Sequence, residues 1–120
     1  MPPAPSFDSV KIISLDRDAL FTQLRAIAAR IRREHREVQD IRVFGSCARG
    51  DATGVSDVDV LILLRHSPQS DPLQRIRAFL PYFDLDRGVD LLVYTRAELE
   101  HQLALQNRFL QKIWRENIPL

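Results

Sequence analysis

Apolar side chains recur every three or four positions along residues 16–37, which is the spacing of one helix face. Asp16 or Ser14 stands where it can cap the first turn of that helix. Three shorter apolar runs follow, each bounded by turn-forming residues, and this pattern is typical of buried strands. We expect the strands at 41–44, 57–64 and 89–94.

The second half of the chain carries clear helix-start signals. Asp71 followed by Pro72 places a capping side chain before a proline at the first helical position, and Pro81 ends or kinks that helix. Thr95 with Glu98 has the spacing of a capping box. The sequence therefore predicts three more helices, beginning near residues 72, 96 and 108.

Apolar positions in these helices are expected to face the core. They are Leu73, Ile76, Phe79 and Leu80 in the first and Phe109, Leu110 and Ile113 in the last, which Asn107 caps. A short edge strand at 10–13 and a loose proline-rich tail at 1–9 complete the prediction, and 117–120 is too short to assign.

Strands alternating with helices predict an α/β (α+β) fold, in which helices pack on a small mixed β-sheet. With 120 residues we expect one domain spanning 1–120. No apolar run approaches the length of a membrane span, and the N-terminal residues do not resemble a secretory signal. The single cysteine, Cys47, excludes an internal disulfide framework, so we expect a cytoplasmic protein.

Charge narrows the choice of partner. The net charge is only +1, from 17 basic and 16 acidic residues, so direct nucleic-acid binding is not expected. A basic cluster within the first helix is most simply a solvated helix face, with a docking patch as the alternative. The cluster comprises Arg30, Arg32, Arg33 and Arg36.

The chemistry of the chain concentrates between the first two strands. Gly45 and Ser46 follow the first strand, where a glycine backbone allows close approach and amide N–H groups can hold a phosphate. After ten residues, Asp57 and Asp59 open the second strand. Alternation along a strand directs these two carboxylates to one face, and oxygen ligands favour a hard cation such as Mg²⁺.

Two further charged residues extend this candidate site. Arg49 is a strong cation close to Gly45-Ser46 and could contact a phosphate or pair with a carboxylate. Asp90 stands one position inside the third strand, where it could complete a three-carboxylate metal site or lie at a solvated strand end. The alternative is that the spacing of Gly45-Ser46 and Asp57-x-Asp59 arose by chance, which is expected in roughly one in several hundred chains of this size.

Gly45-Ser46, ten residues and Asp57-x-Asp59 resemble the signature of the DNA polymerase β-like nucleotidyltransferase superfamily. The stretch GSCARGDATGVSDVDVLILL is similar to its small prokaryotic branch, the minimal nucleotidyltransferases. The resemblance implies the polymerase β-like fold and a third acidic residue on a later strand, which is Asp90 here. It implies that Asp57, Asp59 and Asp90 bind two Mg²⁺ ions, and that Gly45, Ser46 and Arg49 bind the nucleotide triphosphate.

The same resemblance suggests an acceptor. Members of the minimal branch are the antitoxins of HEPN/MNT toxin–antitoxin pairs, which implies a hetero-oligomer with a HEPN-domain RNase toxin. The expected reaction moves AMP from ATP to a hydroxyl of that toxin, most plausibly on a tyrosine. Two alternatives stay open: a steric antitoxin without catalysis that uses its pocket as a nucleotide sensor, and an enzyme that modifies a small molecule. Base preference and stoichiometry are not readable from the sequence.

Overall fold

The computed structural model describes residues 16–120, so the tail expected at 1–9, the strand expected at 10–13 and Ser14 lie outside them. Helix α2 (Arg17–Glu34) begins after Asp16, whose carboxylate accepts a hydrogen bond from the Ala19 N–H. The helix ends earlier than its predicted end near Glu37, because residues 35–37 turn the chain into strand β1 (Val38–Phe44).

Four strands form one mixed sheet in the order β3-β2-β1-β4. Strand β2 (Val58–Leu64) runs antiparallel to β1 and parallel to β3 (Val89–Thr95). Strand β4 (Asn117–Pro119), in the segment left unassigned from sequence, pairs antiparallel with the end of β1. The predicted α/β class with a small mixed sheet is confirmed.

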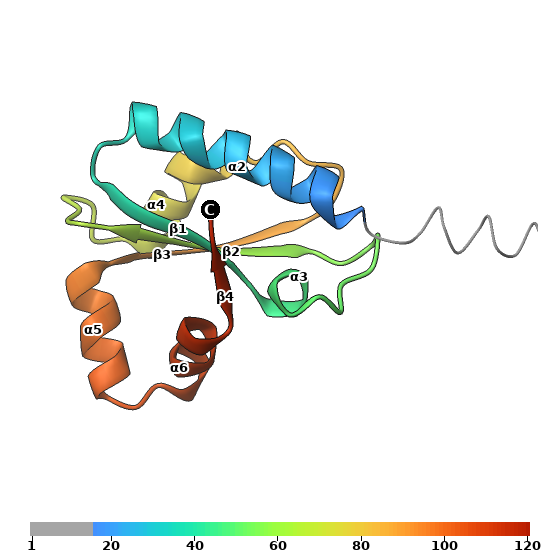
Figure 1. Cartoon of the computed structure of the whole chain (residues 1–120). Coiled ribbons are helices and arrows are strands. Elements are labelled where there is room, and N and C mark those ends of the chain that lie inside the picture. Colours follow the sequence, from blue (N-terminus) through green and yellow to red (C-terminus); the bar gives the residue numbers. More distant parts are fainter. Residues whose placement is uncertain (1–15) are drawn as a thin grey trace, which may run out of the picture.

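Helices cover both faces of this sheet (Figure 1). Helix α2 and helix α4 (Pro72–Phe79) lie on one face, and helices α5 (Arg96–Ala104) and α6 (Arg108–Arg115) lie on the other. Alternating side chains of β2 therefore enter two separate cores: Val60 and Ile62 pack with the α2 side, and Leu61 and Leu63 with the α5 and α6 side. No helix among residues 16–120 has the length and apolar character needed to cross a bilayer.

Helix boundaries follow the predicted capping residues. Asp71 caps α4, Thr95 and Glu98 form a complete capping box on α5, and Asn107 caps α6. Pro81 lies in the short 3-10 helix η1 (Leu80–Tyr82) that follows α4.

Three apolar residues predicted to face the core are instead exposed. Leu73 and Leu80 keep 63% and 42% of their surface, because they lie at the two ends of α4, where the chain meets solvent. Phe109 keeps 59% because it stands at the edge of a cavity rather than inside the core.

Candidate functional site

Asp59 and Asp90 are paired across the parallel strands β2 and β3. Asp59 also lies opposite Phe44, the last residue of β1, so Gly45 follows directly beside it. Asp57 immediately precedes β2 at the same end of the sheet. Three strands therefore bring the predicted carboxylates and the predicted phosphate-binding residues to one edge, although their positions in the chain are far apart.

Gly45 fits this edge because it has no side chain. Its φ angle is +71°, a left-handed conformation that glycine adopts readily. A Cβ at this position would collide with the Oδ2 of Asp59. The absence of a side chain thus lets the backbone of Gly45 and the carboxylate of Asp59 lie against one another.

Asp57 is held by a similar close approach to a different glycine. A Cβ on Gly88 would collide with the Oδ1 of Asp57, and the Gly88 carbonyl accepts a hydrogen bond from the Val58 N–H at 2.9 Å. The carboxylate of Asp57 therefore lies over the turn before β3. Its charge still acts on Asp59, whose pKa it raises after burial and the larger effect of Asp90.

Helix α3 (Gly45–Arg49) follows β1 directly and begins at the glycine itself. Its Ser46 is half-buried and lines the cavity described below. Cys47 is buried, with its Sγ 3.7 Å from the carbonyl oxygen of Asp57, so it packs under the loop that leads to β2. Burial raises the pKa of this thiol, which keeps it protonated.

Arg49 ends α3 and makes ion pairs on both sides. Its Nε lies 3.3 Å from Asp51 Oδ2, and its Nη1 lies 4.0 Å from Glu116 Oε2 at the end of α6. Its guanidinium is partly exposed and lines the same cavity as Ser46. Weak exposed pairs of this kind leave the cation available to a more strongly charged ligand.

The electrostatics of the carboxylate cluster are unfavourable without a cation. Burial is the main cause of a raised pKa at Asp59, followed by the charge of Asp90 and a hydrogen bond with it. The charge of Asp57 raises this pKa further, while Arg49 lowers it. A positive ion beside these oxygens would remove the repulsion.

A cavity of about 610 Å³ opens at this edge of the sheet. Its volume is in the range of small-molecule sites. The sheet contributes Asp59 and Asp90 to its lining, and α6 contributes a further wall. The lining residues are Phe44, Gly45, Ser46, Arg49, Asp59, Asp90, Leu91, Leu92, Phe109, Lys112, Ile113 and Glu116.

The oxygen donors that could hold a divalent metal ion are divided between two places at this edge of the sheet. Among residues 16–120, no three His, Cys, Asp or Glu side chains gather into a metal-binding group. Two of the three predicted ligands, Asp59 and Asp90, are paired at the cavity, whereas Asp57 lies over Gly88. Burial and the charge of Asp90 raise the pKa of Asp59, and a hard cation beside the two carboxylates would offset that charge, so the Asp59–Asp90 pair fits one.

Sequence reasoning missed the wall of the cavity that α6 contributes. Phe109, Lys112 and Glu116 lie at helical spacing on one side of α6 and line the cavity together. The periodicity of this helix was visible in the sequence. Its contact with the end of β1 depends on the packing of the whole layer.

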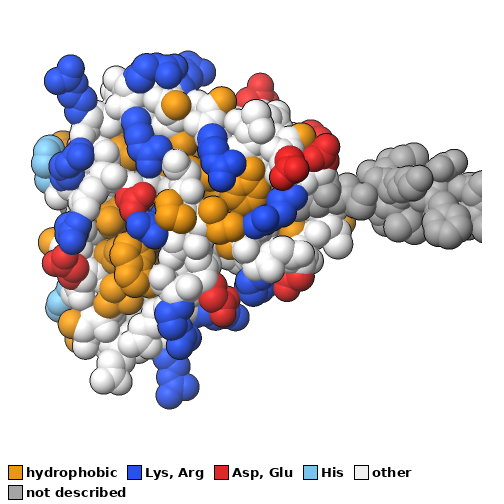
Figure 2. Space-filling view, viewed as in Figure 1, with side chains coloured by type: hydrophobic (Ala, Val, Ile, Leu, Met, Phe, Trp, Pro, Cys, Tyr) orange, Lys and Arg blue, Asp and Glu red, His pale blue; other side chains and the backbone are white. Residues whose placement is uncertain are grey.

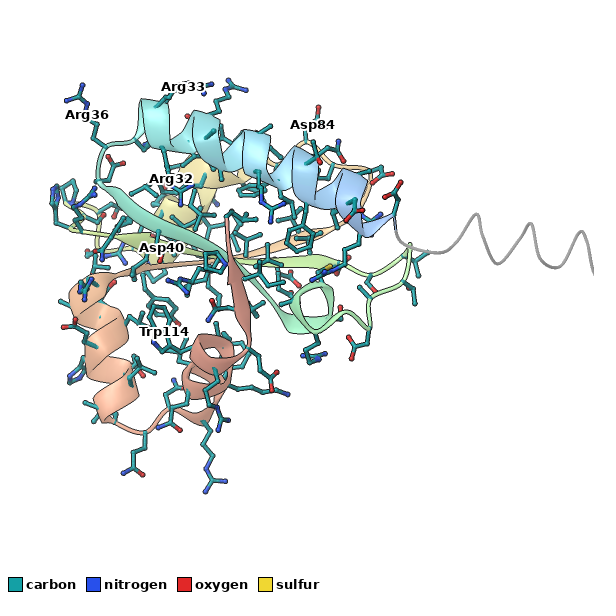
Figure 3. The ribbon with its side chains drawn as sticks, in the orientation of Figure 1. Arg32, Arg33, Arg36, Asp40, Asp84 and Trp114 are labelled. Atoms are coloured by element: carbon teal, nitrogen blue, oxygen red, sulfur yellow. The ribbon has the colours of Figure 1, made fainter. Side chains whose placement is uncertain are left out.

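Lys and Arg side chains gather over α2 and the turn that follows it (Figure 2), where the basic cluster predicted as a solvated face lies. Arg30 pairs with Glu34 within the helix, and Arg32 reaches Asp40 on β1 at 3.9 Å. Figure 3 shows Arg33 and Arg36 directed away from the sheet at the end of α2. This surface is separate from the cavity.

Residues 24–120 match the family of nucleotidyltransferase domains. A provisionally named protein adenylyltransferase of Methanocaldococcus jannaschii is 27% identical over 89 residues, covering 74% of this chain and 82% of that protein. The protein adenylyltransferase MntA of Thermococcus cleftensis is 30% identical over 84 residues, covering 70% of this chain and 76% of that protein.

Two solved structures are similar to this one. The first, provisionally described as a minimal nucleotidyltransferase, shares 28% identity with a TM-score of 0.60 and covers 88% of this chain and 97% of its own. The second, a provisionally described nucleotidyltransferase of Sulfolobus solfataricus, has a TM-score of 0.65 and covers 86% of this chain and 80% of its own. Its identity is 16%, so this second likeness concerns the fold alone.

Proposed function

This chain belongs to the family of nucleotidyltransferase domains and is a minimal nucleotidyltransferase of polymerase β-like fold; on that premise we propose that it transfers AMP from ATP to a protein hydroxyl. The observation that carries this proposal is the pairing of Asp59 with Asp90 beside Gly45 and Ser46 at one cavity. A carboxylate pair next to a backbone segment suited to phosphate matches the needs of phosphoryl chemistry.

We propose Mg²⁺ as the cation, held by Asp59 and Asp90 with Asp57 supplying a further oxygen from the same strand end. When bound, divalent ions at such a site stabilise the charge on the attacking and leaving oxygens of an in-line displacement at phosphorus. We propose that the three carboxylates together would hold two Mg²⁺ ions.

The residues of the chain then have separate roles. Gly45 and Ser46 hold the terminal phosphates through backbone N–H groups and the serine hydroxyl, and Arg49 neutralises part of their charge. Asp90, the more exposed carboxylate of the pair, accepts the proton of the acceptor hydroxyl. The acceptor oxygen forms a bond to the α-phosphorus, the bond from that phosphorus to the bridging oxygen breaks, and pyrophosphate leaves.

A protein acceptor is supported by the names of two relatives, both protein adenylyltransferases. The specific partner that we propose is a HEPN-domain RNase toxin, modified on a tyrosine and held with this chain in a hetero-oligomer. In that case the chain acts as an antitoxin, because the added AMP neutralises the toxin.

A label-transfer experiment tests the reaction. The chain is incubated with Mg²⁺, its HEPN partner and ATP labelled either in the α-phosphate or in the γ-phosphate. Label from the α-phosphate should appear on the partner, and label from the γ-phosphate should leave in pyrophosphate. Transfer of the γ-label to the partner would identify a kinase and contradict the proposal, and α-label found only on an added small molecule would contradict the protein acceptor.

A further inference from the structure

Helix α6 presents both an aromatic ring and a cation to the cavity. Phe109, Lys112, Ile113 and Glu116 recur at intervals of three and four residues and all line it. Ile113 is buried in the α5 and α6 core and fixes the orientation of the helix. Phe109 remains largely exposed, with its ring edge-on to Phe44 at 6.3 Å between centroids.

The chemistry of this wall changes along its length. At one end Glu116 lies 4.0 Å from Arg49, beside the predicted phosphate-binding residues. Lys112 follows one turn away, and Phe109 lies nearly one turn further. A rise of about 1.5 Å per residue puts roughly 10 Å of helix between the charged end and the aromatic end.

A nucleoside triphosphate has the same order of properties, with charged phosphates at one end and a flat aromatic base at the other. We propose that Phe109 stacks on the base of the bound nucleotide and that Lys112 contacts its phosphates. This inference rests on the nucleotidyl transfer proposed above. Phe44, whose ring contacts that of Phe109, and Leu92 supply further apolar surface to the lining of the cavity.

Stacking of Phe109 on the base explains one feature of the structure and makes one prediction. It gives a role to a large apolar side chain that is exposed inside a charged cavity, where burial in the core does not account for it. It also predicts weak discrimination between bases, because every base has a face that can stack.

The test compares two ligands that differ in the base. Dissociation constants of ATP and of inorganic tripolyphosphate are measured by calorimetry in the presence of Mg²⁺. Phe109→Ala should weaken ATP binding about tenfold and leave tripolyphosphate binding unchanged, while Phe109→Trp should restore ATP binding. Lys112→Gln should weaken both ligands by about tenfold, because both carry the phosphates.

A matched control is available on the neighbouring helix end. Leu105 is similarly exposed, at 63%, and lies outside the lining of the cavity. Leu105→Ala should change neither dissociation constant. Thermal unfolding of each variant checks that the fold is intact.

Two results would overturn the inference. Unchanged ATP affinity in Phe109→Ala would exclude stacking, even if transfer to the partner is lost, since Phe109 would then contact the acceptor. Equal weakening of ATP and tripolyphosphate by Phe109→Ala would indicate a general disturbance of the cavity. Failure of the proposed function looks different, because the unmutated chain would then bind ATP without transferring AMP to a protein.

Discussion

Asp59 and Asp90 stand directly opposite one another on the parallel strands β2 and β3, so two carboxylates share one end of the sheet. Like charges opposite one another in a sheet oppose folding. The chain nevertheless places them at its cavity, beside Gly45 and Arg49. A site that binds a cation explains this arrangement, since the ion reverses the sign of the interaction.

Removal of one charge of the Asp59–Asp90 pair should increase the stability of the protein and abolish its activity. We expect Asp90→Asn to raise the free energy of unfolding of the metal-free protein by about 0.2–1 kcal/mol, because repulsion is lost while a hydrogen-bonding side chain remains. The same variant should lose nearly all AMP transfer. Urea unfolding in a chelator at neutral pH measures the first effect, and a variant less stable than the unmutated protein would contradict the explanation.

The raised pKa of Asp59 predicts a pH dependence of stability in the absence of metal. Because the folded-state pKa is higher than the unfolded-state pKa, the folded protein binds more protons in the window between them. The contribution of Asp59 is therefore favourable at low pH and is lost as pH rises through its raised pKa. Urea unfolding over about pH 4 to 7 should show this loss relative to Asp59→Asn.

Addition of Mg²⁺ provides the control for that series. The ion should restore stability at neutral pH in the unmutated protein and have little effect on Asp59→Asn. Equal stabilisation of both proteins by Mg²⁺ would place the cation elsewhere.

Two glycines with positive φ angles form a matched pair around α3. Gly50→Ala should cost about 1 kcal/mol of stability, because φ is +85° but nothing lies within 4 Å of the added Cβ. Gly45→Ala should cost about 1–3 kcal/mol more, because its Cβ meets Asp59 Oδ2. AMP transfer should persist in Gly50→Ala and be lost in Gly45→Ala. Equal AMP transfer by the two variants would contradict a role for the contact between Gly45 and Asp59.

An ion pair away from the cavity, between buried Arg75 and half-buried Glu98, predicts a second pH effect on stability, of opposite sign. Arg75 is 5% exposed and donates hydrogen bonds to Glu98 at 2.6 and 3.2 Å. The hydrogen bond from Arg75 is the main cause of a lowered pKa at Glu98. The stability that this pair contributes is therefore present above the unfolded-state pKa of Glu98 and is lost as pH falls through the lower folded-state value.

Glu98→Gln tests this pair while keeping an acceptor for the capping box. Because 43% of the Glu98 side chain is exposed and solvent screens the pair, we expect the variant to lose about 1 kcal/mol of stability at neutral pH. The difference in stability from the unmutated protein should narrow below about pH 4. Glu100→Gln is the control on the same helix, because its pair with Arg96 at 3.0 Å is exposed and should contribute less than about 1 kcal/mol. A constant difference at every pH would contradict the assignment.

Much of the fold was readable because local signals decide it. The caps at Asp71, Thr95 and Asn107 and the apolar strands each depend on neighbours in the sequence. Asn117 is an example of a residue whose structure local sequence signals do not predict. It begins a strand held by pairing with β1 and by a hydrogen bond from Arg42 Nη1 at 2.8 Å, and both partners are distant in the chain.

The candidate site divides in the same way. The sequence showed a recognisable pattern in Gly45, Ser46, Asp57 and Asp59, and it showed Asp90 as a charge within an apolar run. It did not identify Phe109 as a site residue, because the periodicity of Phe109 fits a core position as well as a cavity wall. Only the packing of α6 against the end of β1 decides between them, and that packing depends on the whole layer of helices.

The most direct test of adenylyl transfer is the intact mass of the proposed HEPN partner after co-expression with this chain. The partner should gain the mass of one or more AMP groups with the unmutated chain and none with the Asp57→Asn/Asp59→Asn variant. A partner that is bound and silenced without any gain in mass would contradict the catalytic mechanism, and the chain would then neutralise its partner by steric masking.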